Sequence, residues 1–248
     1  MFSSIHHMIA EGFNQPQKLV WEGKEIRIFF PSGYEPRYAY PLIVMLHANG
    51  SNDEQILRYA PKISNRNHIF ISLRGPESTE QLDENGQLQY GWGDIRSNLP
   101  AMEQYLFHAI QHARRSFNIH TQRIFLAGIA EGADLAYHVA LNHPEKLAGL
   151  VAINGSLPRE YVGPPFQNNI ENLRILISHG AANEVIPLET ARRDFLSLYS
   201  AGVDVTLNTY PATHQIHPNM LRDINRWIIR GIDRDMNYEC DSRTHLDN

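Results

Sequence analysis

Gly128-Ile129-Ala130-Glu131-Gly132 joins an apolar run, residues 123–127, to a second run, residues 133–140. The first run has the length and composition of a buried strand, and the second has the spacing of a helix. Glycines flank the central residue, Ala130, where a strand and a helix crowd a tight turn and leave no room for side chains. The stretch therefore predicts a strand, a sharp turn and a helix, with Ala130 at the tip of the turn.

A strand, a glycine, a nucleophile between two variable residues, a second glycine and a helix make up the pattern called the nucleophile elbow. Serine is its usual central residue, and here alanine stands in that position. A serine hydroxyl forms an acyl-enzyme after a histidine removes its proton, and the methyl group of Ala130 can perform neither step. The sequence therefore predicts the scaffold of a nucleophilic enzyme without its nucleophile.

Strand-like and helix-like runs alternate on both sides of the elbow. The expected strands cover residues 42–46, 68–73, 147–153, 173–178 and 203–210, and the expected helices cover 52–64, 97–117, 188–199 and 218–230. A hairpin is expected over residues 19–30, and residues 74–94 are expected to form a long loop. This alternation predicts the α/β class, with a mostly parallel sheet and helices on both faces. Ligands of such sheets bind beyond the carboxyl ends of the strands.

The length and composition fit one large domain. The chain has 248 residues, of which 42% are hydrophobic and 20% are charged, as in ordinary globular proteins. Gly231 is expected to end the last helix, because glycine is common just after helix C-termini. We therefore expect one domain over residues 1–231 and a polar tail over residues 232–248.

The charge and the single cysteine restrict the function classes. A formal net charge of -5 gives no electrostatic support for binding nucleic acid or an anionic membrane. No apolar run approaches the ~20 residues of a membrane span. Cys240 is the one cysteine, and the first residues lack the pattern of a signal peptide, so we expect a cytoplasmic protein. No cluster has the spacing of metal ligands, and we expect neither a metal nor a cofactor.

Several further motifs occur in a fixed order around the elbow. They lie at residues 42–50, 73–76, 90–92, 144–149, 179–187 and 210–214. In this order they resemble the phospholipase/carboxylesterase family of α/β-hydrolases, which includes acyl-protein thioesterase-like enzymes and bacterial carboxylesterases. The resemblance extends from about residue 24 to about residue 231. It implies the α/β-hydrolase fold and hydrolysis of carboxylic esters by a Ser-His-Asp triad.

The resemblance gives the triad positions to three residues. Ala130 occupies the position of the nucleophile, and His214 occupies that of the histidine. Asn183 occupies the position of the acid, where aspartate is expected. In a serine enzyme the change from Asp to Asn costs about four decades in rate. A site without both serine and aspartate keeps at most what the oxyanion hole and binding supply, roughly three to four decades over water.

The resemblance also assigns the oxyanion hole and one pocket residue. The oxyanion donors would be the backbone N–H groups of Asn49 and Glu131, although Ala48 stands where the family has a glycine. The Glu131 side chain is expected to point out of the pocket. His47 is expected to brace its loop, and Trp92 is expected either to line the substrate pocket or to pin the long loop.

Three hypotheses about function remain open. In the first, the chain is a naturally inactive family member, a pseudoenzyme that keeps its pocket for binding or regulation. In the second, it is a carboxylesterase or thioesterase whose serine was changed to alanine. In the third, His214 or Glu131 acts as a base in non-acyl chemistry. An ester-like small molecule and a second copy of the chain in a homodimer are the partners that the resemblance allows.

The number of departures from the family pattern favours the first hypothesis. An engineered knock-out normally alters one residue. Here the departures are Ala48, Ala130, Glu131, Ala133 and Asn183.

Overall fold

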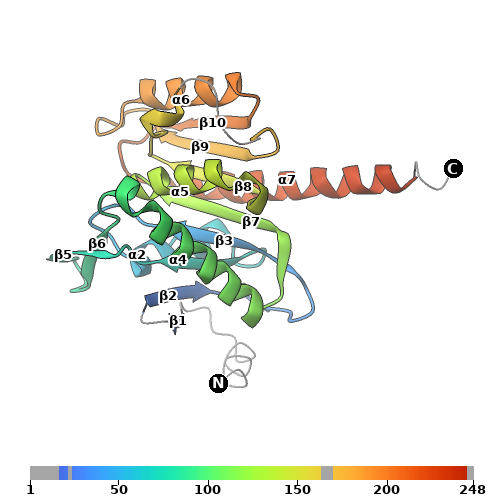
Figure 1. Ribbon diagram of the computed structural model, residues 1–248, viewed down its shortest axis with the longest axis horizontal. Helices are drawn as coiled ribbons and strands as arrows, with labels where there is room; N and C mark the ends of the chain where they lie inside the picture. Colours follow the sequence, from blue (N-terminus) through green and yellow to red (C-terminus); the bar gives the residue numbers. More distant parts are fainter. Residues whose placement is uncertain (1–16, 22–23, 163–169, 245–248) are drawn as a thin grey trace.

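The computed structural model contains an eight-stranded sheet in the order β1-β2-β4-β3-β7-β8-β9-β10 (Figure 1). The structure describes residues 17–21, 24–162 and 170–244. The strands are β1 (Gln17–Trp21), β2 (Lys24–Phe29), β3 (Tyr40–Leu46), β4 (Ile69–Leu73), β7 (Ile119–Ile129), β8 (Gly149–Ile153), β9 (Arg174–Gly180) and β10 (Asp204–Tyr210).

The strands from β4 to β10 in this order are parallel to one another. The antiparallel pair β1 and β2 extends the sheet beside β4. The predicted N-terminal hairpin is therefore confirmed, while its turn at residues 22–23 lies outside the described residues. Strands β3, β4 and β8 are buried along their whole length, because helices cover both faces and continuous apolar runs suit such strands.

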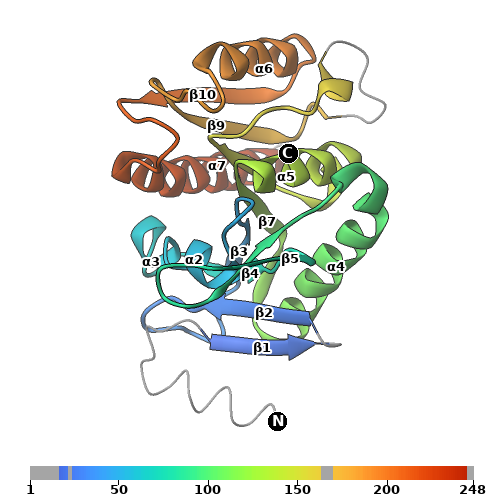
Figure 2. The same ribbon diagram turned by 90° about the vertical axis from the view of Figure 1, so that its left-hand side faces the viewer.

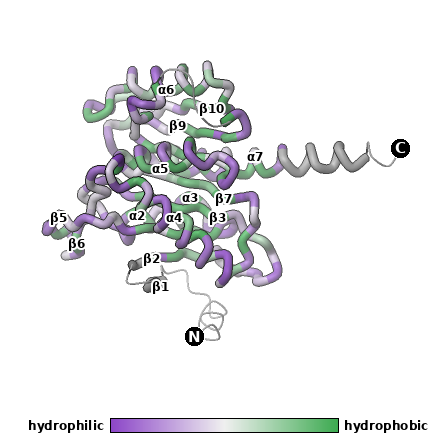
Figure 3. The backbone as a smooth tube through the Cα atoms, viewed as in Figure 1, coloured by the Kyte–Doolittle hydropathy of each residue, from purple (hydrophilic) through white to green (hydrophobic). Residues whose placement is uncertain are grey.

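The two faces of the sheet carry different helices (Figure 2). Helices α2 (Asp53–Leu57), α3 (Ala60–Ile63) and α7 (Pro218–Thr244) enclose one core, and α4 (Ile95–Ser116), α5 (Glu131–Asn142) and α6 (Leu188–Ser200) enclose the other. Two short 3-10 helices, η1 (Pro144–Lys146) and η2 (Arg159–Tyr161), lie in the connections. Hydrophobic residues follow the central strands in Figure 3. The predicted α/β-hydrolase architecture is confirmed.

The single helix predicted over residues 52–64 is wrong, because the structure has two short helices there. Helix α2 ends at Leu57 and α3 begins at Ala60, with Pro61 in its first turn. In a continuous helix the nitrogen of residue 61 would donate to the carbonyl of Leu57, and proline has no N–H to donate. The proline therefore interrupts the helix one turn before its own position.

The long loop predicted over residues 74–94 contains a two-stranded hairpin, β5 (Glu77–Leu82) and β6 (Leu88–Gly91). Asp83 Oδ1 accepts the backbone N–H groups of Asn85 and Gln87, both at 2.8 Å, and so stabilises the turn. The strand β5 is almost wholly exposed. It therefore lacks the apolar alternation from which a strand is predicted. The hairpin projects from the body of the molecule (Figure 1).

Helix α4 begins at Ile95, two residues before the start predicted at residue 97. Asp94 is the cap, and its carboxylate accepts the N–H of Ser97 at 3.5 Å and the hydroxyl of Ser97 at 2.5 Å. The helix buries one face against the core. Its buried members include Met102, Leu106, Ala109, Ile110 and Ala113.

Helix α7 does not end at Gly231, contrary to the prediction, and continues to Thr244. Its second half projects away from the sheet (Figure 1). A Cβ at position 231 would lie 1.4 Å from Nη1 of Arg174, so the glycine makes room for that side chain. The division into residues 1–231 and 232–248 remains a prediction. Within the described part of the chain, no helix is both long and apolar enough to cross a membrane.

Candidate active site

Ala130 lies between the last residue of β7 and the first residue of α5, with φ at 50° and ψ at -116°. A positive φ is uncommon for a residue with a Cβ and is strained. The N–H of Ala130 donates to the carbonyl of Ile153 at the end of β8, at 3.0 Å. The backbone at position 130 therefore has the tight turn that the flanking residues predict.

The two glycines of the turn are required by close approaches of the backbone. A Cβ on Gly128 would lie 2.2 Å from the carbonyl oxygen of Gly132, and one on Gly132 would lie 2.2 Å from that of Leu46. Neither contact can be relieved by turning a side chain, because both partners are backbone atoms. The prediction that these neighbours must lack side chains is confirmed.

Asn183 and His214 follow β9 and β10 and contact each other. The Nδ1–H of His214 donates to Oδ1 of Asn183 at 3.2 Å. The same oxygen accepts the backbone N–H groups of Val185 and Ile186, both at 3.1 Å. Because Nδ1 carries the proton, Nε2 of His214 is left as an acceptor, which is the tautomer that a general base needs.

The surroundings of Asn183 suit a carboxylate better than an amide. Nε2 of His179 must carry a proton, because it donates to the carbonyl of Ile186 at 2.8 Å. The Nδ2 of Asn183 lies 3.5 Å from this nitrogen, so two donors face each other. An aspartate in the same position would turn an acceptor toward His179 and keep the bond to His214.

Asn154, at the end of β8, connects the loops that carry these residues. Its Oδ1 accepts the N–H of Gly180 and its Nδ2 donates to the carbonyl of His214, both at 2.9 Å. It is fully buried and has a φ of 48°. The residue before it, Ile153, receives the N–H of Ala130. These bonds bring the positions of Ala130, Asn183 and His214 to one edge of the sheet.

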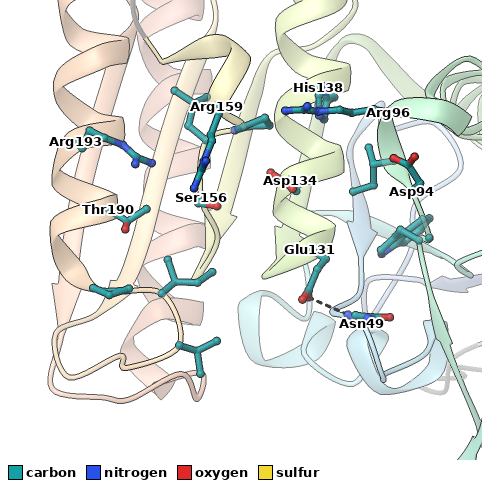
Figure 4. Close-up of a pocket in the computed structure, with 18 of the residues that line it drawn as sticks. Asn49, Asp94, Arg96, Glu131, Asp134, His138, Ser156, Arg159, Thr190 and Arg193 are labelled. Atoms are coloured by element: carbon teal, nitrogen blue, oxygen red, sulfur yellow. Dashed lines mark hydrogen bonds between the residues drawn. The ribbon is translucent and has the colours of Figure 1, made fainter.

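Glu131 lies in the cavity beside the elbow, contrary to the expectation that its side chain points away. Its Oε2 accepts the backbone N–H of Asn49 at 3.2 Å (Figure 4). Glu131 is the first residue of α5, and carboxylates are favoured at helix N-termini. The N–H of Asn49, which the resemblance assigns to the oxyanion hole, is therefore engaged by a carboxylate of the chain itself.

His47 and Trp92 hold the loop that carries Asn49. Nε2 of His47 accepts the N–H of Gly75 at 2.9 Å, so its proton is on Nδ1, which donates to the carbonyl of Ala48 at 2.7 Å. Burial lowers the pKa of His47. The indole N–H of Trp92 donates to the carbonyl of His47 at 2.7 Å, and Trp92 also lines the adjacent cavity. The contacts of His47 are those of a bracing residue. Trp92 holds the same loop and lines the cavity, and its role in binding substrate remains a prediction.

A cavity of about 600 Å³ opens beside the elbow, between α5 and α6. Much of its lining is charged or polar (Figure 4), including Glu131, Asp134, His138, Arg159, Thr190 and Arg193. Burial raises the pKa of Asp134 to about 6, with further contributions from Glu160 and Glu131. Burial also lowers the pKa of His138.

The sequence motifs do not point to Asp134, His138 or Arg159. The spacing of Glu131, Asp134 and His138, three and then four residues apart, places them on one face of α5, and this was the available signal. Among the residues that the structure describes, no three His, Cys, Asp or Glu side chains are grouped to hold a metal ion.

The sequence matches the family described as Phospholipase/Carboxylesterase over residues 35–230. The chain belongs to this family. Acyl-protein thioesterase 1 of Schizosaccharomyces pombe is 23% identical over 155 residues, which cover 58% of this chain and 69% of that protein. Acyl-protein thioesterase 1 of Mycosarcoma maydis is 30% identical over 112 residues, which cover 43% of this chain and 47% of that protein. The chain thus spans less than half the length of the second relative.

Solved structures have the same fold. The carboxylesterase from Mesorhizobium loti has a TM-score of 0.66 at 18% identity, over 88% of this chain and 99% of that one. Acyl-protein thioesterase 2 of Zea mays has a TM-score of 0.64 at 17% identity, over 83% of this chain and 98% of that one. The resemblance stated from the sequence motifs is therefore confirmed at the level of family and fold.

Proposed function

We propose that this chain is a family member without acyl-transfer chemistry, and that it uses its pocket to bind a small molecule. The observation that carries the proposal is the contact between the Glu131 carboxylate and the N–H of Asn49. An oxyanion in that place would have to displace a negative charge. Removing one oxyanion donor costs about two to three decades in rate.

Two separate residues thus oppose two separate requirements of ester hydrolysis, a nucleophile and stabilisation of the oxyanion. Ala130 provides no atom to attack the carbonyl, and Glu131 competes with the charge that develops on the carbonyl oxygen. A serine changed to alanine for study would remove the nucleophile alone. The pair of changes therefore supports natural loss of catalysis over a knock-out. Serine in the genomic codon for residue 130 would contradict this argument.

The bond between His214 and Asn183 favours a second candidate, which is base chemistry on a ligand other than an ester. Nε2 of His214 is left as an acceptor, so it could remove a proton from a bound molecule. This candidate requires turnover of the ligand, whereas the binding proposal does not.

Ester hydrolysis and covalent labelling test the main proposal. The chain and its His214→Ala variant are compared with p-nitrophenyl acetate, and a fluorophosphonate probe is added to both. We expect equal background rates, no burst and no labelling, because such probes need an activated hydroxyl. Turnover more than about tenfold above the His214→Ala control would overturn the proposal. So would stoichiometric labelling, with Ser156 as the first residue to map.

A further inference from the structure

Charges of opposite sign face each other across the cavity without pairing. Glu131 and Asp134 extend from α5, and Arg159 lies on the other side, beside Ser156 (Figure 4). Two neighbouring arginines are neutralised by partners of their own, Arg96 by Glu160 and Arg193 by Asp194. In the described part of the chain, Arg159 has no such ion pair.

Asp134 has one carboxylate oxygen without a hydrogen-bond donor among the residues that the structure describes. Its Oδ1 is buried and has no hydrogen-bond partner within the described residues. A carboxylate with such an oxygen costs free energy in its ionised form, and because Asp134 lines the cavity, a cationic group bound there would offset that cost. The negative charges of the nearby Glu131 and Glu160 carboxylates make a positive group more favourable at this position. A hydrocarbon chain placed here would supply no donor and would remove water from these groups.

We infer that the cavity binds a small zwitterion, whose ammonium group contacts Asp134 and Glu131 and whose anionic group contacts Arg159. The inference deepens the proposed binding function and rests on it. A cavity of about 600 Å³ lies within the range of small-molecule sites, about 300–1,000 Å³. The hydroxyl groups of Ser156 and Thr190 line the same space and can donate to the anionic end.

The ionisation of Asp134 links this binding to pH. The groups that act on Asp134 are Glu131 on its own helix, Glu160 on η2, Asp194 on α6 and Arg96 on α4. An ammonium group prefers the ionised carboxylate, and the pKa of Asp134 is about 6. The affinity should therefore rise from about pH 5 to about pH 7 and then level off.

Calorimetric titration of the full chain tests the inference. The probes are the ω-amino acids from glycine to 6-aminohexanoate, with pentylamine and pentanoate as one-charge analogues of 5-aminopentanoate. We expect at least one zwitterion to bind at pH 7.5 with a Kd below about 1 mM, at least tenfold tighter than its one-charge analogues. A tenfold ratio corresponds to about 1.4 kcal/mol of binding free energy.

Variants assign the two ends of the ligand. Asp134→Asn should weaken binding at least tenfold and remove the rise with pH, and Arg159→Gln should weaken binding at least tenfold at every pH. The controls are Arg192→Gln and Glu189→Gln, whose side chains are exposed on α6 and pair with each other. Both controls should bind like the parent chain. Thermal unfolding of each variant verifies that it is folded.

Three results would overturn the inference: no zwitterion with a Kd below about 1 mM, one-charge analogues that bind within tenfold of the zwitterion, or unchanged affinity in either cavity variant. A different measurement, ester hydrolysis, decides whether the proposed function is wrong. Ester turnover by the parent chain would overturn the non-catalytic proposal and leave zwitterion binding standing. If the parent chain shows neither ester turnover nor zwitterion binding, this inference alone is overturned.

Discussion

At position 130 the backbone has a strained conformation, although the methyl side chain there cannot act as a nucleophile. The φ of 50° carries a cost on the order of 1–3 kcal/mol in such regions, and the surrounding strands and helix maintain it. The turn is therefore a property of the fold, and a serine placed there would have the backbone of a nucleophile.

Restoring activity should require three changes. Ala130→Ser supplies the nucleophile, and Asn183→Asp supplies the charge that stabilises the cationic form of His214. Because Glu131 engages the N–H of Asn49, the double variant should stay weak. Adding Glu131→Ala should raise kcat for short aryl esters by roughly two to three decades, the worth of an oxyanion donor.

Two comparisons verify this prediction. Glu131→Ala in the parent chain should give no gain, because no nucleophile is present. If the double variant is already as fast as the triple variant, Glu131 does not obstruct the oxyanion and only the triad positions limit the rate.

The sequence predicted the triad positions because motif order fixes where loops end. The direction predicted for the Glu131 side chain was wrong, since a motif constrains the backbone and leaves side-chain torsions free. The sequence also did not identify Asn154, which is the first half of an Asn-Gly turn signal. The four hydrogen bonds of that residue come from chain segments distant in sequence.

At the scale of elements, α5 should be more stable without its cavity carboxylate. The pKa of Asp134 is about 6 in the folded chain, above its ordinary value of 3.8, so ionisation costs the folded state free energy. Stability should fall as pH rises from about 4 to about 6. Asp134→Asn cannot ionise, and it should be about 1–3 kcal/mol more stable at pH 7.5.

Denaturant unfolding at several pH values measures this difference. The stabilisation by Asp134→Asn should vanish below about pH 4, where Asp134 of the parent chain becomes protonated in both the folded and the unfolded states. A stabilisation that persists at pH 3 would show that the effect does not come from ionisation of Asp134.

The start of α4 provides a second comparison between neighbouring residues. Asp94 caps this helix, so Asp94→Ala should lower the free energy of unfolding by about 1 kcal/mol. Ser97→Ala removes one exposed partner of that cap and should cost less than half as much. Urea unfolding of the two variants decides, and equal losses would contradict the assignment of the cap.

Elements with a buried side were predictable, and elements without one were not. The apolar runs of β3, β8 and β9 and the helix-like run of α4 are recognisable because burial requires particular residues at particular spacings. The exposed strand β5 has no such requirement. Gly231 suggests a helix end in the sequence. In the structure it makes room for the side chain of Arg174, which is remote in sequence.

At the scale of the molecule, one carboxylate joins the antiparallel edge of the sheet to its parallel part. Asp53 on α2 is fully buried and binds Arg27 of β2 and Arg74 after β4, with distances of 2.7 Å to each. Asp53→Asn leaves both arginines without this charge and should cost about 3 kcal/mol of unfolding free energy.

Glu54→Gln is the matched control for Asp53→Asn. Glu54 pairs with Arg27 and Arg58 nearer the surface, so its loss should cost less than about 1 kcal/mol. Both values come from urea unfolding at pH 7. Similar costs for the two variants would mean that burial of Asp53 adds little to the stability of the sheet.

Because of the hydrogen bonds of Asn154, the shape of the site does not depend on its catalytic side chains. These bonds join the loops after β8, β9 and β10 without the side chain of Ala130, so selection for folding alone preserves the arrangement. Alanine and serine codons can differ by one base, and so can those of asparagine and aspartate. A lineage that lost hydrolysis through such substitutions keeps a template on which few mutations restore it, and the same template stays open to selection for a different ligand.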